Sequence, residues 1–122
     1  MLVLKETIVE SFSTATSSAP FCAFRSEESV TVIIRVKNTG SDADSNGPIE
    51  ITLKKNLLDL KAQENVGAGE AITFFMIPDV KRIEINGIGQ IPVPLRKGEY
   101  RIKVFQDDAS SAGIPAAAVP NP

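Results

Sequence analysis

The sequence contains no histidine and no tryptophan, and it has one cysteine and one tyrosine among 122 residues. Histidine is the central member of the serine triad and of the cysteine–histidine dyad, and it is a usual zinc ligand. Its absence argues against most hydrolase mechanisms and against the common zinc sites. We therefore expect a protein that is not an enzyme and that needs no cofactor.

The single cysteine, Cys22, cannot form a disulfide within the chain. It lies in the segment Pro-Phe-Cys-Ala-Phe, where a small apolar side chain is typical of a buried strand. The sequence therefore predicts a cysteine in the core.

The sequence also has no large excess of charge of either sign: it contains 13 basic and 15 acidic residues, for a net charge of -2. Such a chain has no general attraction to a polyanion, so nucleic acid is not expected as a partner. No apolar run approaches the length that spans a bilayer, and Lys5 and Glu6 interrupt the apolar start of the chain. We expect no membrane partner, no export signal and a chain that stays in the cytoplasm.

What the sequence does contain is a clear strand at residues 30–37. Apolar Val30, Val32, Ile34 and Val36 alternate there with Thr31, Ile33, Arg35 and Lys37. This period of two is typical of a strand with one face in a core. Asn38 and Gly40 follow, and both residue types tolerate positive φ, so we expect the chain to turn there.

Similar alternation recurs along the chain and predicts short strands at residues 2–8, 21–24, 49–54, 72–77, 82–85, 88–91 and 99–105. A charged turn is expected at residues 25–29, and Asn86-Gly87 predicts a hairpin turn. Short strands without a convincing helix are typical of an all-β sandwich. The predicted core contains Val32, Ile34, Val36, Ile51, Leu53, Phe74, Met76, Tyr100, Ile102 and Val104.

Residues 109–122 are rich in alanine, serine, glycine and proline. This composition cannot bury enough apolar surface to order itself. We therefore predict one β-sandwich domain at residues 1–108 and an extended tail at residues 109–122.

Four stretches, at residues 30–40, 49–53, 66–75 and 97–107, together resemble the immunoglobulin-like modules of bacterial surface proteins called CARDB. The resemblance covers residues 25–108. It implies an antiparallel, immunoglobulin-like sandwich of about seven strands with a binding or spacer role, to which the sequence adds extended N- and C-terminal arms. Two departures are the missing export signal and a longer segment at residues 83–94.

One loop resembles half of a calcium site. Asp42, Asp44 and Asn46 place oxygen ligands at alternate positions, and Gly47 allows the sharp turn that follows. Leu53 stands where such a loop needs a bidentate glutamate. The favoured interpretation is a polar loop of ordinary turn formers, with calcium binding as the alternative.

The remaining features predict an interaction protein. Large apolar residues are expected on outer strand faces or in the tail: Ile33, Phe75, Ile77, Phe105, Ile114 and Val119. The first hypothesis is a structural protein of a virion, such as a capsid decoration or cement protein, assembled in the host cytoplasm with capsid protein or copies of itself as partners. The alternative is a cell-surface adhesion or carbohydrate-binding module, and an enzyme that uses carboxylates alone ranks below both.

Overall fold

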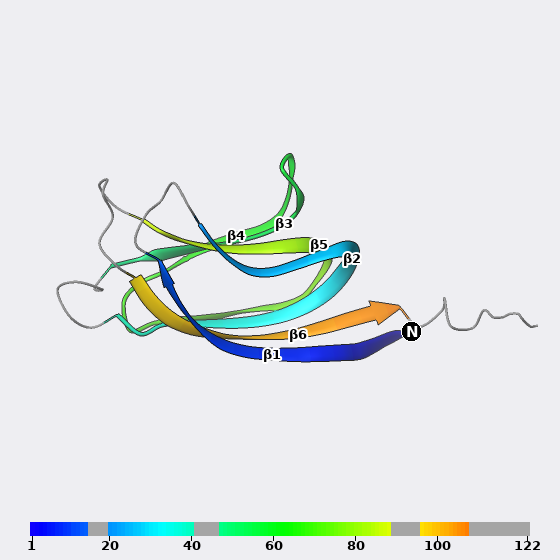
Figure 1. Ribbon diagram of the computed structural model, residues 1–122, viewed down its shortest axis with the longest axis horizontal. Helices are drawn as coiled ribbons and strands as arrows, with labels where there is room; N and C mark the ends of the chain where they lie inside the picture. Colours follow the sequence, from blue (N-terminus) through cyan, green and yellow to red (C-terminus); the bar gives the residue numbers. More distant parts are fainter. Residues whose placement is uncertain (15–19, 41–46, 89–95, 108–122) are drawn as a thin grey trace, which may run out of the picture.

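The computed structural model describes residues 1–14, 20–40, 47–88 and 96–107. These residues form six β-strands and contain no helix, so none that could cross a membrane. The strands are β1 (Leu2–Thr14), β2 (Phe21–Asn38), β3 (Ile49–Asn56), β4 (Asp59–Val66), β5 (Ala71–Gly87) and β6 (Arg96–Asp107). All pairings are antiparallel, in the order β1-β6-β2-β5-β3-β4 (Figure 1). The prediction of an all-β antiparallel protein is confirmed.

Strand β2 contains the pattern that the sequence showed at residues 30–37, and it pairs with β5 on one side and β6 on the other. Val32, Ile34 and Val36 are buried, and Arg35 and Lys37 are exposed, which confirms the predicted alternation. The strand also includes residues 21–29, where the sequence predicted a separate short strand and a charged turn. That segment bends the strand without ending it.

The bend involves both long strands, β2 and β5, which pass from one layer of the structure to the other (Figure 1). Their mutual register shifts between Arg25 and Val30 and twice more before Ile34. On the β5 side, Met76 and Asp79 have φ angles of 54° and 58°. Extra residues of this kind are β-bulges, which bend a strand and increase its twist.

Each layer contains four strand segments because β2 and β5 contribute to both. One layer joins β1 and β6 to residues 30–38 of β2 and 71–77 of β5. The other joins residues 21–25 of β2 and 82–87 of β5 to β3 and β4. The result is an open two-layer sandwich of the jelly-roll kind. The expected immunoglobulin-like type with about seven strands is not confirmed.

One hydrophobic core lies between the layers and takes side chains from all six strands. It consists of Phe12, Ala23, Phe24, Val30, Val32, Ile34, Val36, Ile49, Ile51, Leu53, Val66, Val80, Ile83, Ile85, Tyr100, Ile102 and Val104. The core residues predicted on β2, β3 and β6 are all present. On β5, Phe74 is only partly buried against the core, and the prediction is wrong for Met76, which is not part of it. The positive φ of Met76 interrupts the alternation.

The hairpin predicted at Asn86-Gly87 is wrong. Both residues continue strand β5, where Asn86 pairs with Glu50 and Gly87 pairs with Ile49. The pairing with β3 outweighs the local turn preference of the Asn-Gly pair.

Asn38 is the last residue of strand β2, and its polar side chain is buried. Its side-chain hydrogen bonds to neighbouring segments are called the clamp. Its Nδ2 donates to the Gly47 carbonyl at 2.7 Å and to the Val66 carbonyl at 3.1 Å, and its Oδ1 accepts from the Gly40 amide at 3.0 Å. The strand ends at Asn38, where the sequence predicted that the chain turns. It does so without a positive φ at Asn38, since Met76 and Asp79 are the described non-glycine residues with positive φ. The side-chain amide ties the end of β2 to Gly47, shortly before β3, and to Val66, the last residue of β4.

Candidate functional site

Strands β1 and β4 are the two ends of the sheet, so among the described residues each pairs with a strand on one side only (Figure 1). An end strand presents a row of unpaired backbone N–H and C=O groups, which is a template for pairing with another chain. Both strands also expose apolar side chains. Val9 on β1 is 62% exposed, and Leu60 on β4 is 53% exposed. Backbone and side chains together make these two edges the candidate interaction surface.

More apolar side chains lie near each edge. Leu2 and Leu4 are exposed on the first half of β1. Leu57 and Leu58 occupy the turn of the β3–β4 hairpin, which projects from the body of the protein, and Leu58 is 98% exposed (Figure 1). Sequence reasoning did not select these residues, although two consecutive leucines beside a turn are an available signal.

The interface residues that the sequence predicted differ in their exposure. Phe75 is 71% exposed on β5, as predicted. Ile33 and Phe105 are half-buried on neighbouring strands β2 and β6. The outward position predicted for Ile77 is wrong, because this side chain packs against the core after the bulge at Met76. The two tail residues predicted for the interface, Ile114 and Val119, lie outside the described residues.

The predicted calcium ligands Asp42, Asp44 and Asn46 also lie outside the described residues. Within the described part of the chain, histidine, cysteine, aspartate and glutamate do not come together in any group of three or more that could hold a metal ion. The calcium loop therefore stays a hypothesis from the sequence.

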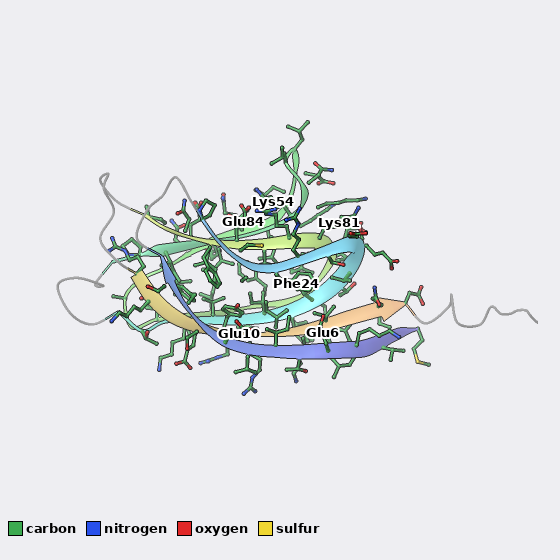
Figure 2. All side chains as sticks on the ribbon, in the orientation of Figure 1. Glu6, Glu10, Phe24, Lys54, Lys81 and Glu84 are labelled. Carbon is green, nitrogen blue, oxygen red and sulfur yellow. The ribbon has the colours of Figure 1, made fainter. Side chains whose placement is uncertain are left out.

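Glu84, on the outer face of β5, forms ion pairs with two basic side chains. Figure 2 labels Glu84 and Lys54, whose Nζ lies 2.9 Å from one of the carboxylate oxygens. Arg82 Nε contacts the other oxygen. Partial burial acts to raise the pKa of Glu84, but the hydrogen bonds and charges of Lys54 and Arg82 outweigh it, so the pKa is lowered. A carboxylate held ionised in this way cannot act as a general acid near neutral pH.

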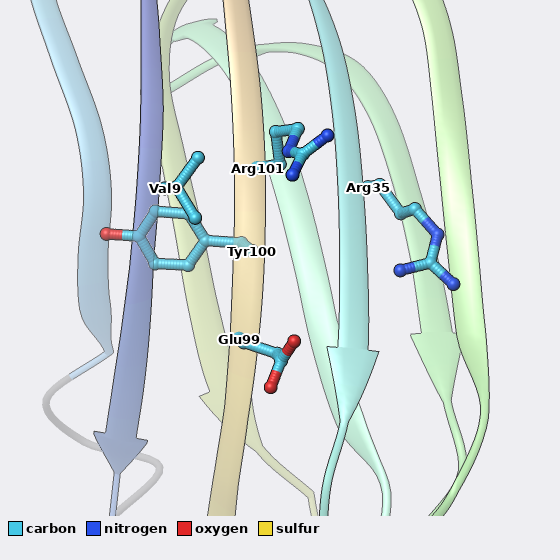
Figure 3. A pocket seen from close by; sticks show the side chains of 5 residues that line it. All are labelled: Val9, Arg35, Glu99, Tyr100 and Arg101. Atoms are coloured by element: carbon cyan, nitrogen blue, oxygen red, sulfur yellow. The ribbon is translucent and has the colours of Figure 1, made fainter.

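A hollow of about 340 Å³ is lined by Val9, Arg35, Glu99, Tyr100 and Arg101 (Figure 3). The tyrosine ring packs with two phenylalanines, at centroid distances of 6.3 Å to Phe12 and 6.1 Å to Phe21. Burial raises the pKa of Tyr100, and the negative charge of Glu10 raises it further. This tyrosine therefore stays protonated near neutral pH and supplies packing, so the hollow offers no activated nucleophile.

Cys22 is exposed, so the predicted core position is wrong. Its thiol sulfur lies 3.4 Å from the Phe24 carbonyl oxygen, on the outer side of β2. The apolar neighbours suggested burial, but Ala23 and Phe24 are the residues that enter the core.

No protein-family model matches the chain, and no curated protein matches it. Among solved structures, the chain is similar to one from work on Bacillus endospore appendages, described as a novel family of disulfide-linked pili. The TM-score is 0.61 at 11% sequence identity, and the match covers 87% of this chain and 89% of the other. At this identity the similarity supports a shared fold. It gives no support to a capsid protein or a CARDB module.

Proposed function

We propose that this chain is a non-catalytic structural subunit that associates with copies of itself through its sheet edges. Strand β1 of one copy pairs with strand β4 of the next. The observation that carries the proposal is the pair of end strands, which no other described strand covers and which both expose apolar side chains. Main-chain hydrogen bonds between edges would supply affinity, and the apolar side chains would supply packing across the contact.

The two edges belong to different strands, so a β1-to-β4 contact is heterologous. Repeating such a contact gives a ring if the rotation closes and an open filament if it does not. The likeness in fold to a protein of a pilus family is consistent with assembly of this kind.

The sequence limits how far copies of this chain could be linked by disulfides. Cys22 is exposed, but it is the one cysteine in the chain. One thiol per chain can link two copies and no more, so growth beyond pairs is non-covalent in this proposal. The partner is a second copy of this chain, and the virion and capsid expected from the sequence are not part of the proposal.

Single substitutions that place a charge on one end strand test whether these strands form the contact. Val9→Lys places a charge on β1, and Leu60→Lys places one on β4. Each should reduce self-association of the full chain, measured by sedimentation velocity over a range of concentrations, because a buried unpaired charge opposes strand pairing. Equal mixing of the two variants should restore pairing, since each keeps one intact edge.

Leu58→Lys is the matched control. It makes the same exchange of leucine for lysine in the β3–β4 turn, outside both end strands. Its association should equal that of the wild-type chain. If Leu58→Lys abolishes association while Val9→Lys and Leu60→Lys do not, the hairpin tip and not the edge strands forms the contact, and the proposal is wrong.

A further inference from the structure

Three basic side chains form a row across neighbouring strands of the outer face. Arg82 on β5 is directly opposite Arg25 on β2 and Lys54 on β3. The next residue along β5, Ile83, is buried in the core, so the row points away from it. Like charges that are directly opposite on a sheet destabilise it. The row is therefore unfavourable until negative charge balances it.

The protein supplies part of that balance. Glu84 forms ion pairs with Lys54 and Arg82, and Figure 2 shows Glu84, Lys54 and Lys81 at the base of the β3–β4 hairpin. A single carboxylate carries one negative charge and serves two cations. It leaves the positive charge of the neighbouring side chains uncompensated.

Those side chains surround a hollow of about 260 Å³, several times the roughly 30 Å³ that a water molecule occupies. The side chains that matter for charge and packing around it are Arg25, Lys54, Lys55, Leu57, Lys81 and Arg82, and no lining residue is acidic. Arg25, Lys55 and Lys81 form no ion pair with any residue that the structure describes. Residues from three separate parts of the chain thus converge on one hollow with uncompensated positive charge.

We propose that this hollow is a binding site for a phosphate-bearing ligand. A phosphate monoester carries about -1.5 to -2 charges at pH 7, against -1 for a carboxylate, and so fits a site with three unpaired cations better. Arg25 can donate two parallel hydrogen bonds to phosphate oxygens, and the lysines act as point charges. The hollow lies beside one end-strand contact, because Lys54 pairs with Leu60 of β4, but none of its lining residues belongs to β1 or β4.

Leucine at the rim indicates that the ligand has an apolar part. Leu57 lines the hollow, and it is 88% exposed. Leu58 beside it is also exposed. A phosphate attached to an apolar body would place its charge among the cations and its body against these leucines. Both a soluble phosphate compound and a phospholipid headgroup have this chemistry.

The test measures binding of two probes to the full chain. Inorganic pyrophosphate is titrated at constant ionic strength, with backbone amide NMR shifts as the readout. Vesicles of phosphatidic acid in phosphatidylcholine are compared with pure phosphatidylcholine vesicles by co-sedimentation. The site variant is Arg25→Gln with Lys81→Gln, which leaves the Glu84 ion pairs in place. The control variant is Lys37→Gln with Lys103→Gln, which removes two exposed cations from the other layer.

We expect saturable binding of at least one probe, with shifts centred on residues 25, 55 and 81. The site variant should weaken that binding about tenfold or more, as losing even one charge-assisted contact would. The control variant should bind like the wild type. Pyrophosphate binding alone identifies a soluble phosphate as the ligand class, and vesicle binding identifies a lipid headgroup. Binding of neither probe, or equal weakening in both variants, overturns the proposal, whatever the state of self-association.

Discussion

Replacing Asn38 by aspartate removes the clamp at the end of β2 while barely changing its shape. The amide makes three side-chain hydrogen bonds and is fully buried. A carboxylate can still accept from the Gly40 amide, but it faces the carbonyl oxygens of Gly47 and Val66, which lie 2.7 and 3.1 Å from the present Nδ2. Removing one partner from a buried polar contact and leaving a charge there costs about 3–5 kcal/mol. We expect that loss in the free energy of unfolding at pH 7.

The loss should depend on pH. Burial against two carbonyls raises the pKa of the new aspartate above its unfolded value of about 3.9. The variant is therefore relatively most stable below that pH, and its stability falls as pH rises through the folded-state pKa. A protonated carboxyl can donate one hydrogen bond, so the loss should shrink to about 1–3 kcal/mol at pH 4.

The assay is urea unfolding of the wild type and the variant at pH 4 and pH 7, at a protein concentration low enough to keep the chain monomeric. Asn38→Ala is the control, because it loses three hydrogen bonds worth about 0.5–1.5 kcal/mol each and adds no titrating group. Its loss should be the same at both pH values. A loss below about 1 kcal/mol for the aspartate at pH 7, or one that does not change with pH, would refute the role of the clamp.

Three further changes test the core, a close contact and the ion pairs. Ile34→Ala should lower the free energy of unfolding in urea by about 2–5 kcal/mol, since Ile34 is fully buried. A loss below about 0.5 kcal/mol would contradict its core position. Gly98→Ala should cost at least about 1–3 kcal/mol, because a Cβ there would lie 2.3 Å from the Phe12 ring and 2.4 Å from a backbone oxygen; unchanged stability would disprove the close approach. Glu84→Gln should destabilise by about 1–3 kcal/mol at pH 7. Because the folded-state pKa of Glu84 is lowered, its contribution to stability is present above the unfolded pKa and is lost as pH falls through the folded-state pKa. The free energies of unfolding of the wild type and the variant should therefore converge in acid. A difference that stays constant with pH would exclude the ion pairs as its source.

The strands with unbroken alternation could be predicted from the sequence. Val32, Ile34 and Val36 on β2, and Ile102 and Val104 on β6, enter the core as their period of two indicates. The middle of a strand depends mainly on which face is apolar, and that information is local.

The bend could not be predicted, because it depends on contacts between distant segments. Bulges at Met76 and Asp79 place non-glycine residues at positive φ, which is uncommon and, for methionine, has no local preference behind it. They also turn Ile77 inward. The same holds for Asn86-Gly87, where a strong local turn signal yields to pairing with β3.

The candidate surfaces could be predicted only in part. Which strands end a sheet is decided by topology, so the exposure of Val9 and Leu60 does not follow from their own segments. The basic hollow joins residues 25, 54–55 and 81–82, which are far apart in the chain and meet through the pairing of β2, β5 and β3. A sequence with a net charge of -2 gives no sign of this local positive charge.

Sedimentation velocity of the full chain is the most direct test of self-assembly. The chain has a mass of 13.1 kDa, so a monomer and larger species are easily separated. Under reducing conditions, we predict that the average mass rises with concentration beyond that of two chains, and that Val9→Lys returns it to the monomer. A mass that stays at 13.1 kDa up to the highest soluble concentration would contradict assembly through the sheet edges.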